Sequence, residues 1–295
     1  SIEAARKVNA RAQENDIIEI EVTPRKFGRI AAQAAKQVVV QRIKEAERNL
    51  IFEEFYNKEG DIVSGLIQRY DKKNIIIDLG KAEAILLSTE QIPSEEYNFN
   101  ERIKTYVIEV KRTTKGPQIF VSRTHPGLVK RLFELEVPEI HDGIVEIKAI
   151  SREPGSRTKI AVFSKDENVD PVGACVGHKG TRVQAVVDEL KGEKIDIIKW
   201  SMNPAEFISS SLSPARVLRV DINEEEKSAR VIVPDYQLSL AIGKEGQNAR
   251  LSAKLTGWKI DIKSESQLRS EIENHFFSTS LSNNYTQEFD VQNEE

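Results

Sequence analysis

Cysteine is almost absent from this 295-residue sequence, which contains one, Cys175, together with four scattered histidines. A single cysteine excludes an internal disulfide framework, and the histidines show no spacing typical of a zinc site. We therefore expect no metal and no cofactor, and a reducing, cytoplasmic setting. Because Cys175 lies in the small, apolar stretch 173–176, we interpret it as a buried filler and not as a reactive thiol.

Long hydrophobic runs are also missing. No stretch of about 18 apolar residues occurs, and no signal peptide is visible, so we expect no membrane partner. The content of 39% hydrophobic and 31% charged residues is typical of soluble globular proteins. At roughly 100–150 residues per domain, the chain has room for two or three domains.

An excess of basic residues is lacking too, since the net charge is −4. The acidity is concentrated in residues 265–295, which contain one basic and seven acidic residues, against 42 basic and 40 acidic in the remainder. Binding of a nucleic acid must therefore depend on where individual cations are placed and not on bulk charge. The polar composition of 265–295 predicts a disordered tail.

The N-terminal part is predicted to be mainly helical. Residues 1–16 have a helical pattern, and 16–23 alternate as a short strand does. Residues 29–56 have apolar side chains at three- and four-residue spacing and contain no proline or glycine. A helix of that length, about 40 Å at ~1.5 Å per residue, is typical of a connector between folded bodies.

Five short strand patterns follow within about 60 residues, separated by turn residues. This density predicts a small closed β-barrel. The predicted strands are 61–68, 74–80, 84–87, 102–110 and 118–122.

The next part of the sequence contains an internal duplication. Each copy has a strand, a Gly-x-x-Gly tetrapeptide, a helix and an Ile-Asp-Ile strand. The first copy comprises 158–162, 177–180, 181–190 and 194–198. The second comprises 229–233, 243–246, 247–255 and 259–262. The tetrapeptides are 66 residues apart and the Ile-Asp-Ile strands 65, so we predict two domains of one kind.

The tetrapeptides carry the candidate chemistry. Glycine at the first and fourth positions lets the backbone approach a ligand, and the following helix N-terminus attracts an anion. Lysine between the glycines can meet a phosphate. This is the clamp with which a KH module holds about four nucleotides of single-stranded RNA. The two clamps are Gly177-His178-Lys179-Gly180 and Gly243-Lys244-Glu245-Gly246.

The spacing of the glycines does not match a nucleotide-binding motif of enzymes. Gly173 and Gly177 lie one residue too close for a nucleotide-binding P-loop, and His178 stands where that motif needs lysine. No base or nucleophile lies near His178 in the sequence, so we interpret it as a solvated loop residue or a contact to RNA and not as a catalytic residue. We therefore predict no catalytic residue.

Long stretches of the sequence resemble the NusA family of bacterial transcription factors. The resemblance is carried by 170–182 with the first tetrapeptide and by 233–258, VPDYQLSLAIGKEGQNARLSAKLTGW, with the second. It extends to 22–33 and 147–162, and overall from about 16 to 264.

The resemblance implies an α+β multidomain fold with two tandem KH domains of the prokaryotic type (type II) behind a five-stranded barrel of the S1/OB type. The family's N-terminal, polymerase-contacting domain is longer than the part present here. The implied order is 1–58 partial N-terminal domain, 59–124 S1 domain, 125–200 first KH domain, 201–264 second KH domain and 265–295 tail.

The implied function is that of a transcription elongation factor in pausing, termination and antitermination. The implied partners are nascent single-stranded RNA, RNA polymerase and other elongation or antitermination factors, and we expect a monomer. Twelve residues carry over as RNA-facing: Gly177, His178, Lys179, Gly180, Arg182, Gly243, Lys244, Glu245, Gly246, Gln247, Asn248 and Arg250.

Two other functional classes also contain KH and S1 modules. RNA-degrading phosphorylases carry KH and S1 modules, but with KH before S1 and beside a large catalytic core, for which this chain has no room. A ribosome-associated or RNA-processing protein built from KH and S1 modules stays open as the alternative.

Overall fold

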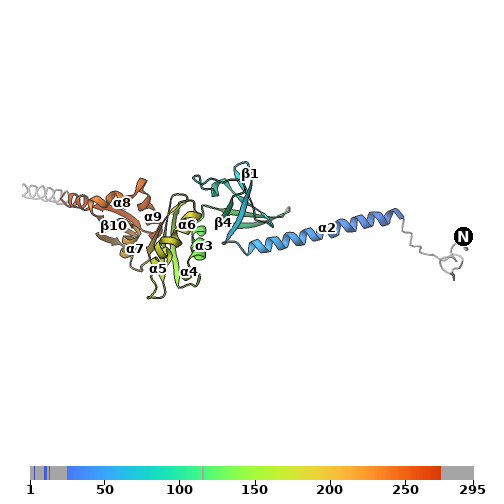
Figure 1. Cartoon of the computed structure of the whole chain (residues 1–295), viewed down its shortest axis with the longest axis horizontal. Helices are drawn as coiled ribbons and strands as arrows, with labels where there is room; N and C mark the ends of the chain where they lie inside the picture. The colour runs from blue at the N-terminus through green and yellow to red at the C-terminus, as the bar shows by residue number, and fades with distance from the viewer. Residues whose placement is uncertain (1–2, 4–9, 12, 14–24, 115, 274–295) are drawn as a thin grey trace, which may run out of the picture. The chain divides into compact units, whose positions relative to one another are not determined.

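The structure is a computed structural model that describes residues 3, 10, 11, 13, 25–114 and 116–273 (Figure 1). The chain divides into two compact units, residues 1–54 and 55–295. The strand predicted at 16–23 lies outside the described residues, as does nearly all of the helix predicted at 1–16. Helix α2 (Arg25–Tyr56) confirms the long helix predicted from residue 29 and begins four residues earlier. None of the helices among the described residues combines the length and apolarity needed to cross a membrane.

The second unit begins with a closed barrel whose strands follow the order β1-β2-β3-β5-β4. Strands β3 and β5 run parallel, and the other neighbours are antiparallel. The interior is close-packed: a Cβ on Gly65 would lie 2.4 Å from the side chain of Ile77. The predicted five-stranded barrel is confirmed. Its strands are β1 (Ile62–Asp71), β2 (Asn74–Asp78), β3 (Glu83–Leu86), β4 (Arg102–Thr113) and β5 (Gly116–Ser122).

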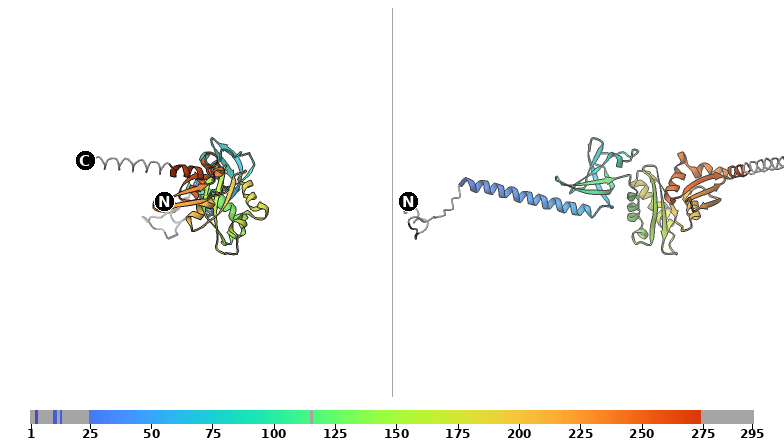
Figure 2. Two further views of the ribbon diagram at one scale, coloured as in Figure 1. Left: turned by 90° about the vertical axis from the view of Figure 1, so that its left-hand side faces the viewer. Right: turned by 180° about the vertical axis from the view of Figure 1, so that it is seen from behind.

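The duplicated part folds into two similar α+β domains, here called KH1 and KH2. KH1 comprises α3 (Pro126–Glu136), α4 (Pro138–His141), β6 (Val145–Glu153), β7 (Arg157–Ser164), α5 (Pro171–Val176), α6 (Thr181–Glu189) and β8 (Lys194–Lys199). KH2 comprises α7 (Pro204–Ser211), β9 (Arg219–Asn223), β10 (Ser228–Val233), α8 (Leu238–Ile242), α9 (Gln247–Thr256) and β11 (Lys259–Ser264). Figure 2 shows these elements from two further sides.

Both sheets have the topology of a type II KH domain. In each, the central strand pairs antiparallel with the strand before it and parallel with the last strand, so that β8 and β11 are edge strands. The predicted fold class is confirmed. Cys175 is fully buried in the KH1 core, where burial raises the pKa of its thiol to about 12, so the interpretation as a buried filler is also confirmed.

KH1 and KH2 share an apolar cluster. Ala161 and Ile198 of the KH1 sheet pack against Phe207 of α7 and Leu255 of α9, and all four are buried. Beside this cluster the buried Lys159 donates a hydrogen bond of 3.0 Å from its Nζ to the carbonyl oxygen of Ser213 in KH2. The two domains therefore form one body.

A buried ion pair lies between the barrel and KH1. Arg123, at the end of β5, donates to both carboxylate oxygens of Glu95, at 3.0 Å from Nε and 2.6 Å from one terminal nitrogen. The same guanidinium donates to the carbonyl oxygens of Lys104 in the barrel and Glu189 in KH1, at 2.9 and 3.0 Å. Arg123 thus ties the two domains together.

Residues 265–273 are helical, which corrects the prediction of a disordered tail for that part. The cause is a capping box: the Ser264 amide donates to the Gln267 side chain at 3.0 Å, and the Gln267 amide donates to the Ser264 hydroxyl at 3.3 Å. Residues 274–295 of the predicted tail lie outside the described residues.

Candidate nucleic-acid interface

The two tetrapeptides adopt the same backbone conformation. Gly177 and Gly243 have φ/ψ of 73°/177° and 77°/172°. The third positions, Lys179 and Glu245, are left-handed at 51°/26° and 53°/26°. Each loop is closed by a 3.2 Å hydrogen bond from the amide of its fourth glycine to the carbonyl oxygen of its first. The two tetrapeptides therefore form the same loop structure in both domains.

The first and fourth glycines are needed for different reasons. A Cβ on Gly177 would lie 2.7 Å from the Arg182 side chain, and one on Gly243 would lie 2.8 Å from Asn248. A Cβ on Gly246 would meet nothing within 4 Å, but its φ of 74° favours glycine. The fourth glycine therefore leaves the outer side of the loop open to a ligand.

The residues between the glycines face solvent. His178, Lys179, Lys244 and Glu245 are all exposed. Among the described residues, neither the Lys179 nor the Lys244 ammonium group has a hydrogen-bond or ion-pair partner. No side chain caps the N-terminus of α6 or α9. Each loop thus presents a free cation beside an uncapped helix N-terminus, an arrangement suited to a phosphate.

Arg182 and Asn248 occupy equivalent positions, five residues after the first glycine, and both point back at the preceding helix. Arg182 donates to the Ala174 carbonyl oxygen at 2.6 Å and to Glu139 at 2.8 Å. The buried Asn248 amide donates to the carbonyl oxygens of Leu240 and Ala241, at 3.2 and 3.1 Å. Both side chains satisfy carbonyl groups that a helix end leaves without partners, and they fix the loop from beneath.

Gln247 and Arg250, in the first turn of α9, contact KH1. Both donate to Glu153, at 2.8 Å from Gln247 Nε2 and 2.6 Å from Arg250 Nε. The hydrogen bond from Arg250 lowers the pKa of Glu153 below its ordinary value, against the effect of burial. Arg250 also donates to the carbonyl oxygen of Glu245 at 3.1 Å. The KH2 loop is therefore braced against KH1, and RNA contact by Gln247 and Arg250 stays a prediction.

The support that the Asn248 side chain gives to the KH2 loop can be tested with Asn248→Ala. The change removes the donors to Leu240, Ala241 and also Leu212, which accepts at 3.0 Å. It also removes the buried Oδ1 of Asn248, which has no partner among the described residues. We expect the free energy of unfolding to fall by about 1–2 kcal/mol, measured by urea denaturation, and RNA affinity to fall several-fold.

The matched control is Gln184→Ala, which removes an exposed amide of α6 that donates a hydrogen bond to Asp188. It should change stability by less than about 0.5 kcal/mol. Equal stability of the two variants would show that Asn248 does not hold the loop.

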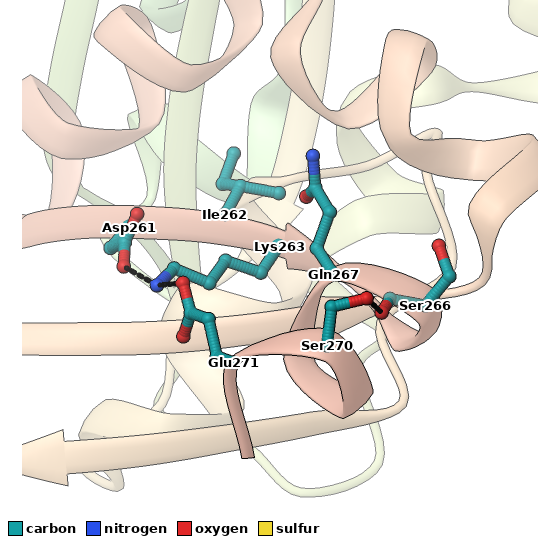
Figure 3. A pocket seen from close by; sticks show the side chains of 7 residues that line it. All are labelled: Asp261, Ile262, Lys263, Ser266, Gln267, Ser270 and Glu271. Carbon is teal, nitrogen blue, oxygen red and sulfur yellow. Dashed lines mark hydrogen bonds and ion pairs between the residues drawn. The ribbon is translucent and has the colours of Figure 1, made fainter. Parts of the chain in front are cut away.

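A hollow of about 500 Å³ lies between the edge strand β11 and the helix at 265–273 (Figure 3). Figure 3 shows Lys263 between two carboxylates. Its Nζ lies 3.6 Å from Asp261 and contacts Glu271, and the hydrogen bond with Glu271 raises the pKa of Lys263. Because the charge of Lys263 is already compensated, this hollow does not offer a free cation to a phosphate.

Sequence reasoning did not single out the lysines that begin the two edge strands. Lys194 and Lys259 begin the edge strands β8 and β11, and both are exposed. The signal was present, since each lysine directly precedes the repeated Ile-Asp-Ile.

An S1-type barrel followed by two KH domains with open Gly-x-x-Gly loops defines a class of RNA-binding proteins. Family models match this chain in the same order: a NusA N-terminal domain over 1–49, an S1 RNA binding domain over 56–122, a NusA-like first KH domain over 123–200 and a NusA-like second KH domain over 204–270.

Curated relatives identify the family. A protein of Bacillus subtilis is 63% identical over 269 residues, covering 91% of this chain and 72% of the relative. One from Halalkalibacterium halodurans is 62% identical, covering 90% and 70%, and one from Thermus thermophilus is 50% identical, covering 85% and 65%. Each is named transcription termination/antitermination protein NusA. The chain belongs to the NusA family.

Proposed function

We propose that this chain binds single-stranded nascent RNA through its two Gly-x-x-Gly loops and acts with RNA polymerase in pausing, termination and antitermination. The observation that carries the proposal is the pair of exposed loops with the same backbone conformation, each with a lysine that has no partner in the described part of the chain. The names of the relatives support the role in termination and antitermination. We expect the protein to act as a cytoplasmic monomer, without a cofactor and not as an enzyme.

The shared apolar cluster lets the two loops bind one RNA strand together. Because Phe207 and Leu255 of KH2 pack on the KH1 sheet, the two loops are held at one separation. A strand that fills one loop is then positioned to enter the other without further loss of orientational freedom, which raises the effective concentration of the second contact. Two individually weak clamps act in this way as one binding surface.

The residues have two roles in the proposal. His178, Lys179, Lys244 and Glu245 contact the RNA backbone together with the glycines around them. Arg182, Gln247, Asn248 and Arg250 support the loops, and direct RNA contact by these four stays a prediction.

The proposal is tested in two steps. Labelled single-stranded RNA should bind the purified chain, with fluorescence anisotropy as the readout, and a duplex of the same length should bind at least tenfold more weakly. In transcription assays with purified bacterial RNA polymerase, the chain should change the fraction of transcripts that end at an intrinsic terminator at least twofold. A pull-down with core polymerase measures whether the chain binds the enzyme directly.

Three results would contradict the proposal. Equal binding of single strand and duplex would remove the KH clamp as the binding mode. Cosedimentation with ribosomal subunits, with no effect on transcription, would favour the ribosome-associated alternative. Processive shortening of the RNA in the presence of phosphate would indicate an enzyme.

A further inference from the structure

The start of the KH1 edge strand lies next to the KH2 loop. The Ser156 carbonyl oxygen accepts a hydrogen bond of 3.1 Å from the Lys194 amide. The Ser156 hydroxyl accepts one of 2.8 Å from the side chain of Gln247, which directly follows the KH2 loop. The turn at 153–156 therefore connects the first residue of β8 with the first residue of α9.

The Lys194 side chain lies on the face of the KH1 sheet that is turned toward KH2. In β8, Ile195 and Ile197 pack into the KH1 core, whereas Ile198 belongs to the cluster shared with KH2. Side chains alternate between the two faces of a strand. Lys194 therefore shares its face with Asp196 and Ile198 and lies at the solvent-exposed end of that row.

The junction has more positive than negative charge. Asp196 is paired with Arg157 at 2.7 Å and with Lys159 at 3.2 Å, and Glu153 is paired with Arg250 at 2.6 Å. Both carboxylates are therefore already matched by cations. Lys194 beside the turn and Lys254 on α9 are both exposed.

Neither of these lysines has a hydrogen bond or an ion pair from its side chain among the described residues. Lys254 lies four residues after Arg250, on the same side of α9. It is close enough to help Arg250 lower the pKa of Glu153. Two uncompensated positive charges thus flank the turn at 153–156.

We propose that Lys194 and Lys254 form a third phosphate-binding site, which holds a single RNA strand where it crosses from the KH1 edge strand to the KH2 loop. The inference rests on the proposed function. A KH loop holds about four nucleotides, so a strand that occupies both loops must cross the junction. Lys194 lies at the turn that contacts the first residue of α9, and Lys254 lies near Glu153 of the same turn.

The second copy supplies a matched control. Lys259 begins β11 as Lys194 begins β8, and it is equally exposed and without a side-chain partner among the described residues. Beside Lys259, however, no second KH loop lies in the part of the chain that the structure describes. If a lysine at the start of an edge strand were sufficient for RNA binding, Lys259 and Lys194 would contribute equally to the affinity. If the crossing between the domains matters, only Lys194 contributes.

The experiment measures binding of two labelled single-stranded RNAs to the full chain. One has about five nucleotides and fills one loop, and the other has about twelve and reaches both. With Lys194→Gln/Lys254→Gln, affinity for the long RNA should fall roughly five- to tenfold. The slope of log affinity against log salt should shrink by about 1.4, because each lost phosphate contact contributes about 0.7. Affinity for the short RNA should stay within about twofold, and Lys259→Gln should stay within twofold for both RNAs.

The outcomes separate this inference from the proposed function. Unchanged affinity for the long RNA, or an equal loss for both lengths, overturns the junction site while leaving the two loops in place. A loss of the same size with Lys259→Gln overturns it as well, because the effect would then be one of general charge. If the unaltered chain binds neither RNA, the proposed function itself fails.

Discussion

Replacing Lys179 and Lys244 together with glutamate should weaken binding of single-stranded RNA at least tenfold. Each change removes an exposed ammonium group, which has no partner among residues 25–114 and 116–273, from a loop tip and puts a carboxylate in its place. A phosphate at the loop then loses an attraction and meets a repulsion. Because each phosphate contact contributes about 0.7 to the salt slope of a single strand, the slope should shrink by about 1.4.

The measurement is fluorescence anisotropy at several salt concentrations. Lys227→Glu is the control, since Lys227 is an exposed lysine in the turn between β9 and β10 and belongs to neither tetrapeptide. It should change affinity less than threefold and leave the slope nearly unchanged. The single variants Lys179→Glu and Lys244→Glu measure the share of each loop. If the double variant kept both the affinity and the salt slope of the unaltered chain, the loops would not be the clamp.

Arg123→Ala should lower the free energy of unfolding by about 3–5 kcal/mol, the largest effect on stability that we expect. The Arg123 side chain is 0% exposed and its partner Glu95 is 2% exposed. Removing the guanidinium leaves a buried carboxylate without a cation, which destabilises the fold far more than replacing both charged residues does. The carbonyl oxygens of Lys104 and Glu189 lose their donor as well.

The exposed pair on the same barrel, Arg69 with Glu83 at 2.7 Å, is the control. Arg69→Ala should cost no more than about 1 kcal/mol, again by urea denaturation. The double variant Arg123→Met/Glu95→Leu tests the cause, because it removes both charges at once and should recover most of the loss. A loss that remained in the double variant would assign the effect to packing and not to the unpaired charge.

The sequence predicted the features that are local and repeated. The Gly-x-x-Gly tetrapeptide fixes its own backbone, so two copies with nearly equal spacing of their elements were enough to predict both loops and the domains around them. The strands of the barrel were predictable because turn residues separate short alternating runs. The helix after Ser264 was also encoded locally, in Ser264 and Gln267, but the polar composition of the tail concealed it.

Contacts between distant residues were not predictable. The family resemblance implied that Arg182, Gln247, Asn248 and Arg250 face RNA, whereas their observed hydrogen bonds reach helix ends and a second domain. Glu153, for example, lies 94 and 97 residues from Gln247 and Arg250. The proximity of Lys194 to the KH2 loop depends on the same long-range packing. No spacing rule within one sequence brings such residues together.

The apolar cluster of Ala161, Ile198, Phe207 and Leu255 limits how this chain can be divided for engineering. A KH1 excised or grafted alone onto another scaffold would expose Ala161 and Ile198 to water, and a bare sheet face of this kind promotes self-association. An isolated KH2 would expose Phe207 and Leu255 in the same way. The smallest fragment that can be transferred to another scaffold is therefore KH1 together with KH2. In a library that recombines single KH domains, most members would expose these apolar residues and aggregate.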